Sequence, residues 1–387
     1  MNKVIVAALR TDESDEAWQQ RMEEMQRLCE ACGMTVLASL TQRAERPWSR
    51  TLLGQGKCLQ LKELAWQRGA EGVVFLNDLS GMQLRNLNQL LQVETVDRSA
   101  LILMLFERSA RTRQAVLQVQ AARLAWQRSR LVQGQIGADQ QQGGGFRNRG
   151  AGESRLELNR RTLDRQLKTI RRRLDQLKVQ DQTRRDRRQR SGLPRVCLIG
   201  YSNAGKSSLM NALLCRQGRP QAKQVVQRDQ LFATLDSSVR RMRLKDGQQY
   251  LLADTVGFVR DLPDFLLEAF ESTLQELKQA DLLIEVIDAA DASWPYQHHT
   301  VWQTLQRLDA AMIPVIRVYN KIDLVTQWQR LDGIAVSCRY GQGLDELQQQ
   351  IADALPASGI GRQPWENQDE IDDDLVYNGV KEEKRSC

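Results

Sequence analysis

The chain of 387 residues has only two histidines and eight prolines, and it has no long apolar run. Its longest apolar run, residues 100–106, is far shorter than the roughly 20 residues of a membrane-spanning helix. Residues 1–18 turn acidic too early for the apolar core of a secretory signal, so we expect a cytoplasmic protein. The histidines, His298 and His299, are remote in the sequence from every cysteine pair, which argues against a zinc site.

The seven cysteines are scattered and odd in number, so no disulfide framework is visible. Cys29 and Cys32 have the spacing of half a zinc site, but no second pair of this kind follows. Both fall on one face of an amphipathic helical pattern that ends at Gly33. We therefore interpret them as part of helix packing rather than as a metal or redox centre.

Proline is almost absent from the first half of the chain, where only Pro47 precedes Pro194. Long helices are therefore permitted between these two prolines. From about Leu101 the pattern is helical, and leucine or isoleucine recurs every seven residues from position 156 to position 177. Such a repeat predicts that two helices pack antiparallel. A Gln/Gly-rich loop over about residues 133–152 should join them and be exposed.

The first hundred residues alternate short apolar runs with helical patterns, which predicts a small α/β domain with a mostly parallel sheet. We therefore divide the chain into an α/β domain (1–100), a helical hairpin (101–193), a second α/β domain (194–357) and an acidic tail (358–387).

The net charge of +7 is unevenly distributed. Residues 147–190 hold 16 basic and 6 acidic side chains, whereas residues 364–387 hold 3 basic and 8 acidic ones. The basic segment fits either the solvated face of a coiled coil or a surface that binds a polyanion. The candidate RNA-binding residues are Arg147, Arg149, Arg155, Arg160, Arg161, Arg171, Arg172 and Arg173.

The segment that follows Pro194 contains a phosphate-binding motif. Gly200, Gly205, Lys206 and Ser207 form the pattern GxxxxGKS, and they lie between an apolar strand pattern and a helical one. Such a loop wraps its backbone N–H groups around phosphates, while the lysine reaches the β- and γ-phosphates and the serine holds magnesium. The strand–loop–helix context makes the motif specific.

Three further motifs follow in the order that a GTPase requires. Thr234 is placed to contact magnesium and the γ-phosphate, and Asp254 and Gly257 form a DxxG motif after an apolar strand. The motif of residues 320–323, NKID, selects guanine because its aspartate accepts hydrogen bonds from two guanine donors that adenine lacks. Residues 337–338 should contact the guanine oxygen. Together the motifs predict a P-loop GTPase (Ras-like) domain over 194–357.

The predicted catalytic residues are Lys206, Thr234 and Gly257, and the predicted magnesium ligands are Ser207, Thr234 and Asp254. The predicted nucleotide-binding residues are Gly200, Tyr201, Ser202, Asn203, Ala204, Gly205, Lys206, Ser207, Ser208, Asp254, Thr255, Val256, Gly257, Asn320, Lys321, Asp323, Ser337 and Cys338.

Several motifs together resemble the HflX family of ribosome-associated GTPases. They are GYSNAGKSSLMNALL (200–214), DTVGFVRDLP (254–263), NDLSGMQLRNL (77–87), VDRSALIL (96–103) and GAGESRLELNRR (150–161). The resemblance implies a monomeric GTPase that binds the large ribosomal subunit and its RNA, and that splits or rescues stalled or idle ribosomes under stress. Ala151 and Ser154 depart from the family pattern, as in a divergent paralogue.

Phe258 stands where Ras-like GTPases have the glutamine that orients the attacking water. The resemblance implies that backbone groups, an ion or a group supplied by a partner does this instead, so we expect slow hydrolysis that ribosomes stimulate. Three alternatives stay open at this point: a ribosome-assembly GTPase, a nucleotide-gated RNA- or ribosome-binding protein with negligible turnover, and a coiled-coil scaffold.

Overall fold

The computed structural model describes residues 1–139, 149–190, 192–217, 238–255, 257–258, 260, 263, 265–266, 277–326 and 332–355, with side chains outside 132–139, 149–156 and 178–190. It contains two compact units. One comprises residues 1–108 and 119–172, and the other comprises residues 109–118 and the chain from 173 onward.

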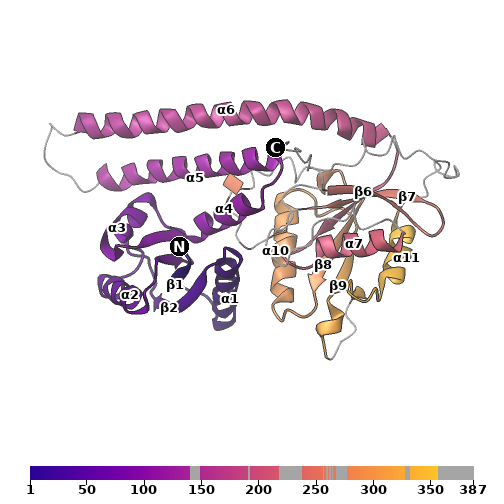
Figure 1. The fold of residues 1–387 in the computed structure, drawn as a ribbon, viewed down its shortest axis with the longest axis horizontal. Helices are drawn as coiled ribbons and strands as arrows, with labels where there is room; N and C mark the ends of the chain where they lie inside the picture. Colours follow the sequence, from indigo (N-terminus) through magenta and orange to yellow (C-terminus); the bar gives the residue numbers. More distant parts are fainter. Residues whose placement is uncertain are drawn as a thin grey trace, which may run out of the picture. The chain divides into compact units, whose positions relative to one another are not determined.

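The first unit contains a four-stranded parallel sheet with the strand order β2-β1-β3-β4 (Figure 1). Its elements are β1 (Lys3–Arg10), α1 (Asp15–Ala31), β2 (Thr35–Arg43), α2 (Gln55–Arg68), β3 (Gly72–Phe75), α3 (Gly81–Leu91) and β4 (Glu94–Asp97). Ser80 caps α3 through a reciprocal pair of hydrogen bonds with Gln83, which ends the preceding loop at a defined residue. The predicted α/β fold with a mostly parallel sheet is confirmed.

Three helices follow the sheet: α4 (Arg98–Ser109), α5 (Arg113–Asp139) and α6 (Arg149–Arg190). The predicted domain boundary at residue 100 falls inside α4. The helices also extend into the loop that we predicted over residues 133–152: α5 continues to Asp139, and α6 begins at Arg149. Neither helix contains a proline that would end it earlier. That prediction was therefore too long at both ends.

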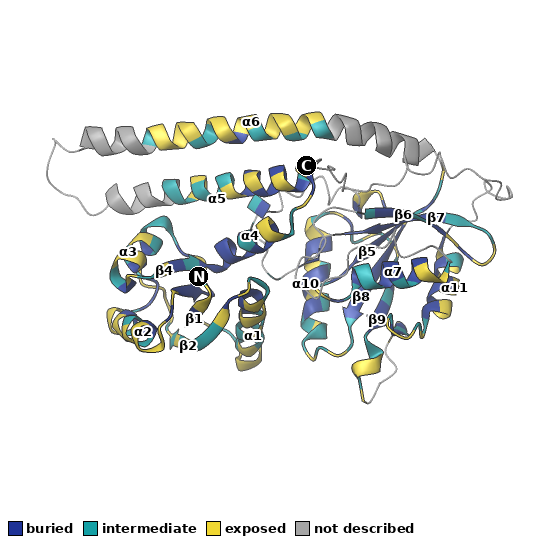
Figure 2. Ribbon diagram, in the orientation of Figure 1, coloured by how far each residue is buried: buried dark blue, intermediate teal, exposed yellow. Residues whose placement is uncertain are grey.

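Within the first unit, α5 and α6 lie side by side and antiparallel (Figure 1). Arg128 Nε on α5 lies 2.8 Å from Asp164 Oδ1 on α6. Leu167 of the predicted heptad repeat is buried, and Ala121 and Ala122 of α5 are buried as well. Figure 2 shows that the remaining described face of α6 is largely exposed.

The second unit contains a six-stranded sheet with the order β10-β9-β8-β5-β7-β6, in which only β6 runs antiparallel to its neighbour. Its strands are β5 (Arg195–Ile199), β6 (Ser238–Arg243), β7 (Gln249–Asp254), β8 (Leu282–Asp288), β9 (Val315–Asn320) and β10 (Ile334–Val336). Helices α7 (Lys206–Arg216) and α11 (Leu344–Ala354) contribute to one apolar core with all six of these strands, and α10 (Trp294–Arg307) packs on β8. In such sheets, ligands bind at the carboxyl ends of the parallel strands.

None of the helices in the described part of the chain is long and apolar enough to cross a membrane.

Candidate functional site

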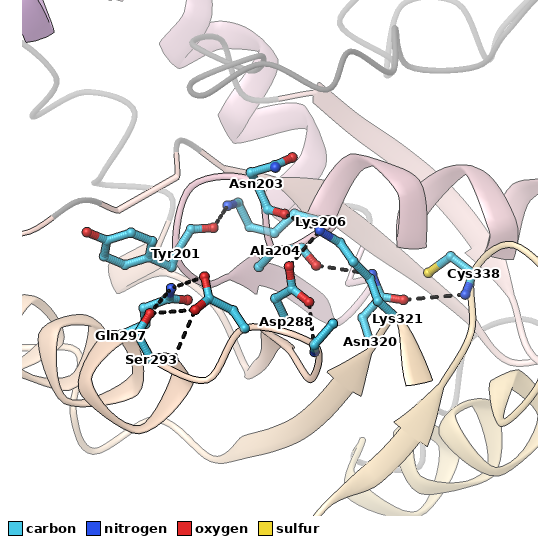
Figure 3. Close-up of polar contacts among 12 residues, drawn as sticks. Tyr201, Asn203, Ala204, Lys206, Asp288, Ser293, Gln297, Asn320, Lys321 and Cys338 are labelled. Carbon is cyan, nitrogen blue, oxygen red and sulfur yellow. Dashed lines mark hydrogen bonds and ion pairs between the residues drawn. The ribbon is translucent and has the colours of Figure 1, made fainter. Parts of the chain in front are cut away.

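The phosphate-loop motif occupies the turn between β5 and α7, as the sequence predicts (Figure 3). Gly200 and Gly205 have φ angles of 146° and 97°, which side chains rarely permit. A Cβ atom on Gly200 would overlap the backbone oxygen of Val286, and one on Gly205 would overlap the amide nitrogen of Asn320. The two glycines therefore let the loop lie directly against the ends of β8 and β9.

Lys206 begins α7 and its side chain turns back into the loop. Its ammonium donates to the backbone oxygens of Gly200 at 3.1 Å and of Tyr201 at 3.0 Å. Burial lowers the pKa of the Lys206 ammonium to about 8, while the nearby Asp254 acts in the opposite direction. The cation thus lies inside the curve of the loop, where its three donors can serve either backbone oxygens or phosphate oxygens.

Two oxygen-bearing side chains meet beside this loop. Ser207 Oγ lies 2.6 Å from Asp254 Oδ2, and Asp254 is fully buried at the end of β7. The next residue, Thr255, donates its hydroxyl proton to the backbone oxygen of Leu198 at 2.6 Å, which ties the end of β7 to β5. Ser208 follows in α7 and is half-buried.

The DxxG segment pairs directly with the phosphate loop. Phe258 donates its N–H to Gly200 O at 3.1 Å and accepts from the Ser202 N–H at 2.8 Å. At Gly257 a Cβ atom would come within 2.8 Å of Ser202 Cα and within 3.1 Å of Lys206 Nζ. The Phe258 side chain is buried, so it cannot orient a water molecule. Its role in this arrangement is to pack, while its backbone forms hydrogen bonds.

The four residues of the NKID motif join β9 to the phosphate loop. Asn320 donates from Nδ2 to Ala204 O at 3.1 Å, and Lys321 donates from Nζ to Asn203 O at 3.0 Å. Lys321 itself has a left-handed φ of 64°, which directs its side chain over the loop. The base-recognition motif and the phosphate loop are therefore one connected structure.

The loop after β10 supports the carboxylate of the same motif. Ser337 Oγ donates to Asp323 Oδ1 at 2.7 Å, and Cys338 N–H points to Asn320 Oδ1 at 3.4 Å. Burial raises the pKa of the Cys338 thiol to about 12. Its backbone, and not its sulfur, is therefore the group with which Cys338 can take part in recognition.

Asp288, which we did not predict, belongs to this cluster. It ends β8 opposite Asn320 of β9, and its Oδ2 lies 2.6 Å from Lys321 Nζ. The one sequence signal was an aspartate at the end of an apolar run, LLIEVID, as also occurs at Asp254. Asp288 and Asn203 O together hold the Lys321 ammonium from two sides (Figure 3).

Three family models match consecutive parts of the chain. They are described as GTP-binding GTPase N-terminal (residues 19–107), GTP-binding GTPase middle region (109–188) and 50S ribosome-binding GTPase (195–321). GTPase HflX of Caldanaerobacter subterraneus subsp. tengcongensis is 38% identical over 351 residues, which cover 90% of this chain and 79% of that one. GTPase HflX of Escherichia coli K12 is 37% identical over 343 residues, covering 86% and 79%. The chain belongs to the HflX family of GTPases.

Membership of the HflX family confirms the predicted family and enzyme class: the chain is a GTP hydrolase. The predicted P-loop GTPase fold of its second α/β domain is also confirmed. A GTP-binding protein from Sulfolobus solfataricus, solved with GDP, aligns with a TM-score of 0.46 at 19% identity, covering 92% of this chain and 98% of that one.

Two of the predicted nucleotide- and magnesium-binding residues, Thr234 and Val256, lie outside the described residues. The other residues of these two groups gather around the carboxyl ends of β5, β7, β9 and β10.

The predicted RNA-binding arginines lie on other elements of this HflX GTPase. Arg147 lies outside the described residues, and Arg149 and Arg155 belong to the part of α6 whose side chains are not described. The exposed members are Arg160, Arg161, Arg171, Arg172 and Arg173. Arg161 Nε lies 3.1 Å from Glu157 Oε1, an exposed pair that leaves most of the basic character of α6 unchanged.

Cys29 is buried in α1, and burial raises the pKa of its thiol to about 12. In the part of the chain that the structure describes, no group of three histidine, cysteine or carboxylate side chains is arranged to hold a metal ion. The burial of Cys29 supports the interpretation of this residue as part of helix packing.

Proposed function

We propose that GTP lies along the carboxyl ends of β5, β8 and β9. Its phosphates contact the loop from Gly200 to Ser208, and its guanine contacts Asn320, Asp323 and the backbone of Ser337 and Cys338. The hydrogen bond from Ser337 to Asp323 supports this proposal, because it orients the carboxylate that would accept the two guanine donors. Lys321, which donates to Asn203 O of the phosphate loop, would lie along one side of the nucleotide.

Magnesium fits the pair formed by Ser207 and Asp254. Both are oxygen donors, which this hard cation prefers, and they already lie within 2.6 Å of each other. Thr234 is the third ligand that the sequence predicts. When bound, the ion would neutralise charge on the β- and γ-phosphates. Lys206 and the N–H of Gly257 would stabilise the same charge from the protein side.

The buried Phe258 supports the expectation that hydrolysis by the isolated chain is slow. A group that a partner supplies can raise the rate of a GTPase about 10³–10⁵-fold. We therefore expect the partner that binds the GTP form to supply or order the water-positioning group. Loss of the γ-phosphate would release the segments that contain Thr234 and Gly257 and change the affinity for that partner.

The proposed partner is the large ribosomal subunit with its RNA, and the proposed outcome is the splitting or rescue of stalled or idle ribosomes in the cytoplasm. The main support for this proposal is the set of exposed arginines on α6. In addition, the GTPase domain of the chain matches the family model described as a 50S ribosome-binding GTPase. Ordered arginines on a long helix suit the phosphate backbone of RNA. Helix α6 ends at Arg190, and β5 begins five residues later at Arg195. The proposed RNA-binding helix is therefore connected in sequence, by a short segment, to the strand that precedes the phosphate loop.

Co-sedimentation with separated ribosomal subunits tests the proposal. The wild type, bound to a non-hydrolysable GTP analogue, should pellet with the large subunit and should do so less when bound to GDP. The triple variant Arg171→Gln, Arg172→Gln, Arg173→Gln should lose most of this binding. A control that neutralises Lys3, Arg68 and Lys278, which are exposed outside α6, should retain it.

The proposal fails if the wild type binds neither subunit, or if the α6 variant binds as well as the control. A sucrose gradient then tests whether the protein splits ribosomes. If it does, free subunits should appear when intact ribosomes are incubated with the protein and GTP. Binding to the large subunit without release of subunits would favour the role in ribosome assembly.

A further inference from the structure

The loop between β2 and α2 carries an exposed tryptophan on a well-fixed backbone. Trp48 donates its N–H to Leu52 O at 3.1 Å, and Leu52 donates its N–H to Trp48 O at 2.9 Å. Closing this short turn forces Leu52 into a left-handed conformation with φ of 64°. A branched residue adopts this conformation only where the surroundings impose it, which often marks a functional segment.

Two side chains of α3 donate hydrogen bonds to backbone oxygens of the same loop. Gln83 donates from Nε2 to Trp48 O at 3.0 Å, and Asn86 donates from Nδ2 to Arg50 O at 3.0 Å. The indole packs against Gly54, where an added Cβ atom would lie 3.3 Å from Cζ2 of the ring. The hydrogen bonds fix the backbone that carries the ring, the ring lies against Gly54, and 42% of Trp48 is exposed. A partner would therefore meet a pre-organised aromatic surface.

Four exposed arginines lie on the loop that carries this ring or on the elements next to it. Residues 43–50 contain Arg43, Arg46 and Arg50 and only one acidic residue, Glu45. Arg85 is next to Asn86 in α3, the helix whose side chains anchor the loop. All four arginines are exposed. The result is an aromatic ring in a basic surface.

We propose that this surface, formed by Arg43, Arg46, Trp48, Arg50 and Arg85, binds single-stranded RNA. An unpaired base would stack on the Trp48 indole, and the arginines would contact the flanking phosphates. A duplex keeps its base faces stacked internally and offers none to the indole. An acidic peptide would satisfy the arginines but has no need of a fixed, exposed ring. This inference rests on the proposed function, because it takes the partner to be RNA. The surface around Trp48 would be a second RNA-binding site, separate from the one on α6.

Trp66 provides a matched comparison. It is 83% exposed on α2, yet its neighbours one helical turn earlier, Lys62 and Glu63, cancel in charge. Both tryptophans are thus exposed. Of the two, only Trp48 lies on a fixed loop with basic neighbours. If exposure alone decided RNA binding, the two tryptophans would behave alike.

Fluorescence anisotropy with a labelled oligouridylate of about 12 nucleotides measures the interaction on the full chain. Trp48→Ser should weaken binding roughly fivefold or more, because stacking on one base is lost. Trp48→Phe should restore most of the affinity, and Trp66→Ser should have no effect. The double variant Arg46→Gln, Arg50→Gln should also reduce the dependence of log affinity on log salt by about 1.4 units. A control with Lys3→Gln and Arg68→Gln should leave that slope unchanged.

Photo-crosslinking identifies the site directly. RNA with 4-thiouridine should crosslink to the tryptic peptide 44–50, which contains Trp48 because trypsin does not cleave before Pro47. This crosslink should persist in the variant with Arg171, Arg172 and Arg173 neutralised, so it does not depend on the α6 contact or on ribosome binding. The proposal is overturned if Trp48→Ser binds RNA like the wild type while unfolding at the same temperature. It is also overturned if duplex RNA or a polyglutamate peptide binds with equal affinity and the same dependence on Trp48.

Discussion

Replacing Asp288 with asparagine should weaken the binding of GTP and GDP by about the same factor. Asp288 Oδ2 lies 2.6 Å from Lys321 Nζ, which also donates to Asn203 O of the phosphate loop. The pair is partly shielded, since the side chains of Lys321 and Asp288 are 28% and 17% exposed. Asparagine keeps an oxygen acceptor at this place but removes the charge that holds the lysine.

A hydrogen bond between charged groups contributes about 1.5–3 kcal/mol, and a neutral acceptor retains about half of this. The expected loss is therefore about 1.1 kcal/mol, or about sixfold in dissociation constant. Because Lys321 contacts the loop at Asn203 O, whereas Asp254 contacts Ser207, we expect the same factor for nucleotides with and without the γ-phosphate.

Equilibrium titration with fluorescent GDP and with a fluorescent non-hydrolysable GTP analogue measures both constants. Asp309→Asn is the matched control: it removes one carboxylate from an exposed turn, and asparagine tolerates the left-handed φ of 54° found there. Wild-type affinity for both nucleotides in Asp288→Asn would show that Asp288 does not position Lys321. A loss confined to the GTP analogue would place the effect on the γ-phosphate instead.

Three further predictions concern stability and reactivity. Asp97→Ala should lower the free energy of unfolding by about 3 kcal/mol in urea titrations, because it leaves Arg130 without its buried carboxylate partner. Burial raises the pKa of the Glu285 carboxyl, with His298 and Arg317 acting in the opposite direction. The folded chain thus holds this proton more tightly than the unfolded chain, so the stabilising contribution is complete below pH 4.5 and is lost as pH rises through the folded pKa. Wild type should accordingly lose stability relative to Glu285→Gln as the pH rises above 4.5, and a constant difference would contradict this. The exposed Cys215 should react with iodoacetamide at about pH 8 at least tenfold faster than Cys338, whose thiol pKa is raised to about 12, as peptide mass mapping would show.

Much of the nucleotide site was predictable because its motifs are local. The spacing from Gly200 to Ser207 places a lysine and a hydroxyl at the start of a helix in any chain with this turn. The residues that join separate motifs were not predictable in this way. The Asp288–Lys321 contact requires β8 and β9 to be neighbours in the sheet, and strand order is not written in either segment.

The helical hairpin shows a similar division. The absence of proline and the heptad repeat correctly indicated long helices, but glycines such as Gly134 and Gly137 suggested a loop where α5 in fact continues. Glycine lowers helix stability by only about 1 kcal/mol, which the surrounding helix can offset. Trp48 was missed for another reason. Whether a tryptophan is buried or exposed depends on contacts such as those with Leu52 and Gly54 of its own loop and with Gln83 of the distant helix α3.

The phosphate loop has a consequence for nucleotide exchange. Its backbone groups already find partners within the chain: Gly200 O accepts from Lys206 and from the Phe258 N–H, Tyr201 O accepts from Lys206, and Ser202 N–H donates to Phe258 O. A departing GDP molecule would therefore leave behind few unpaired polar groups that need solvation. We therefore expect GDP to be exchanged for GTP without an exchange factor, so that the partner that triggers hydrolysis would set the rate of the cycle.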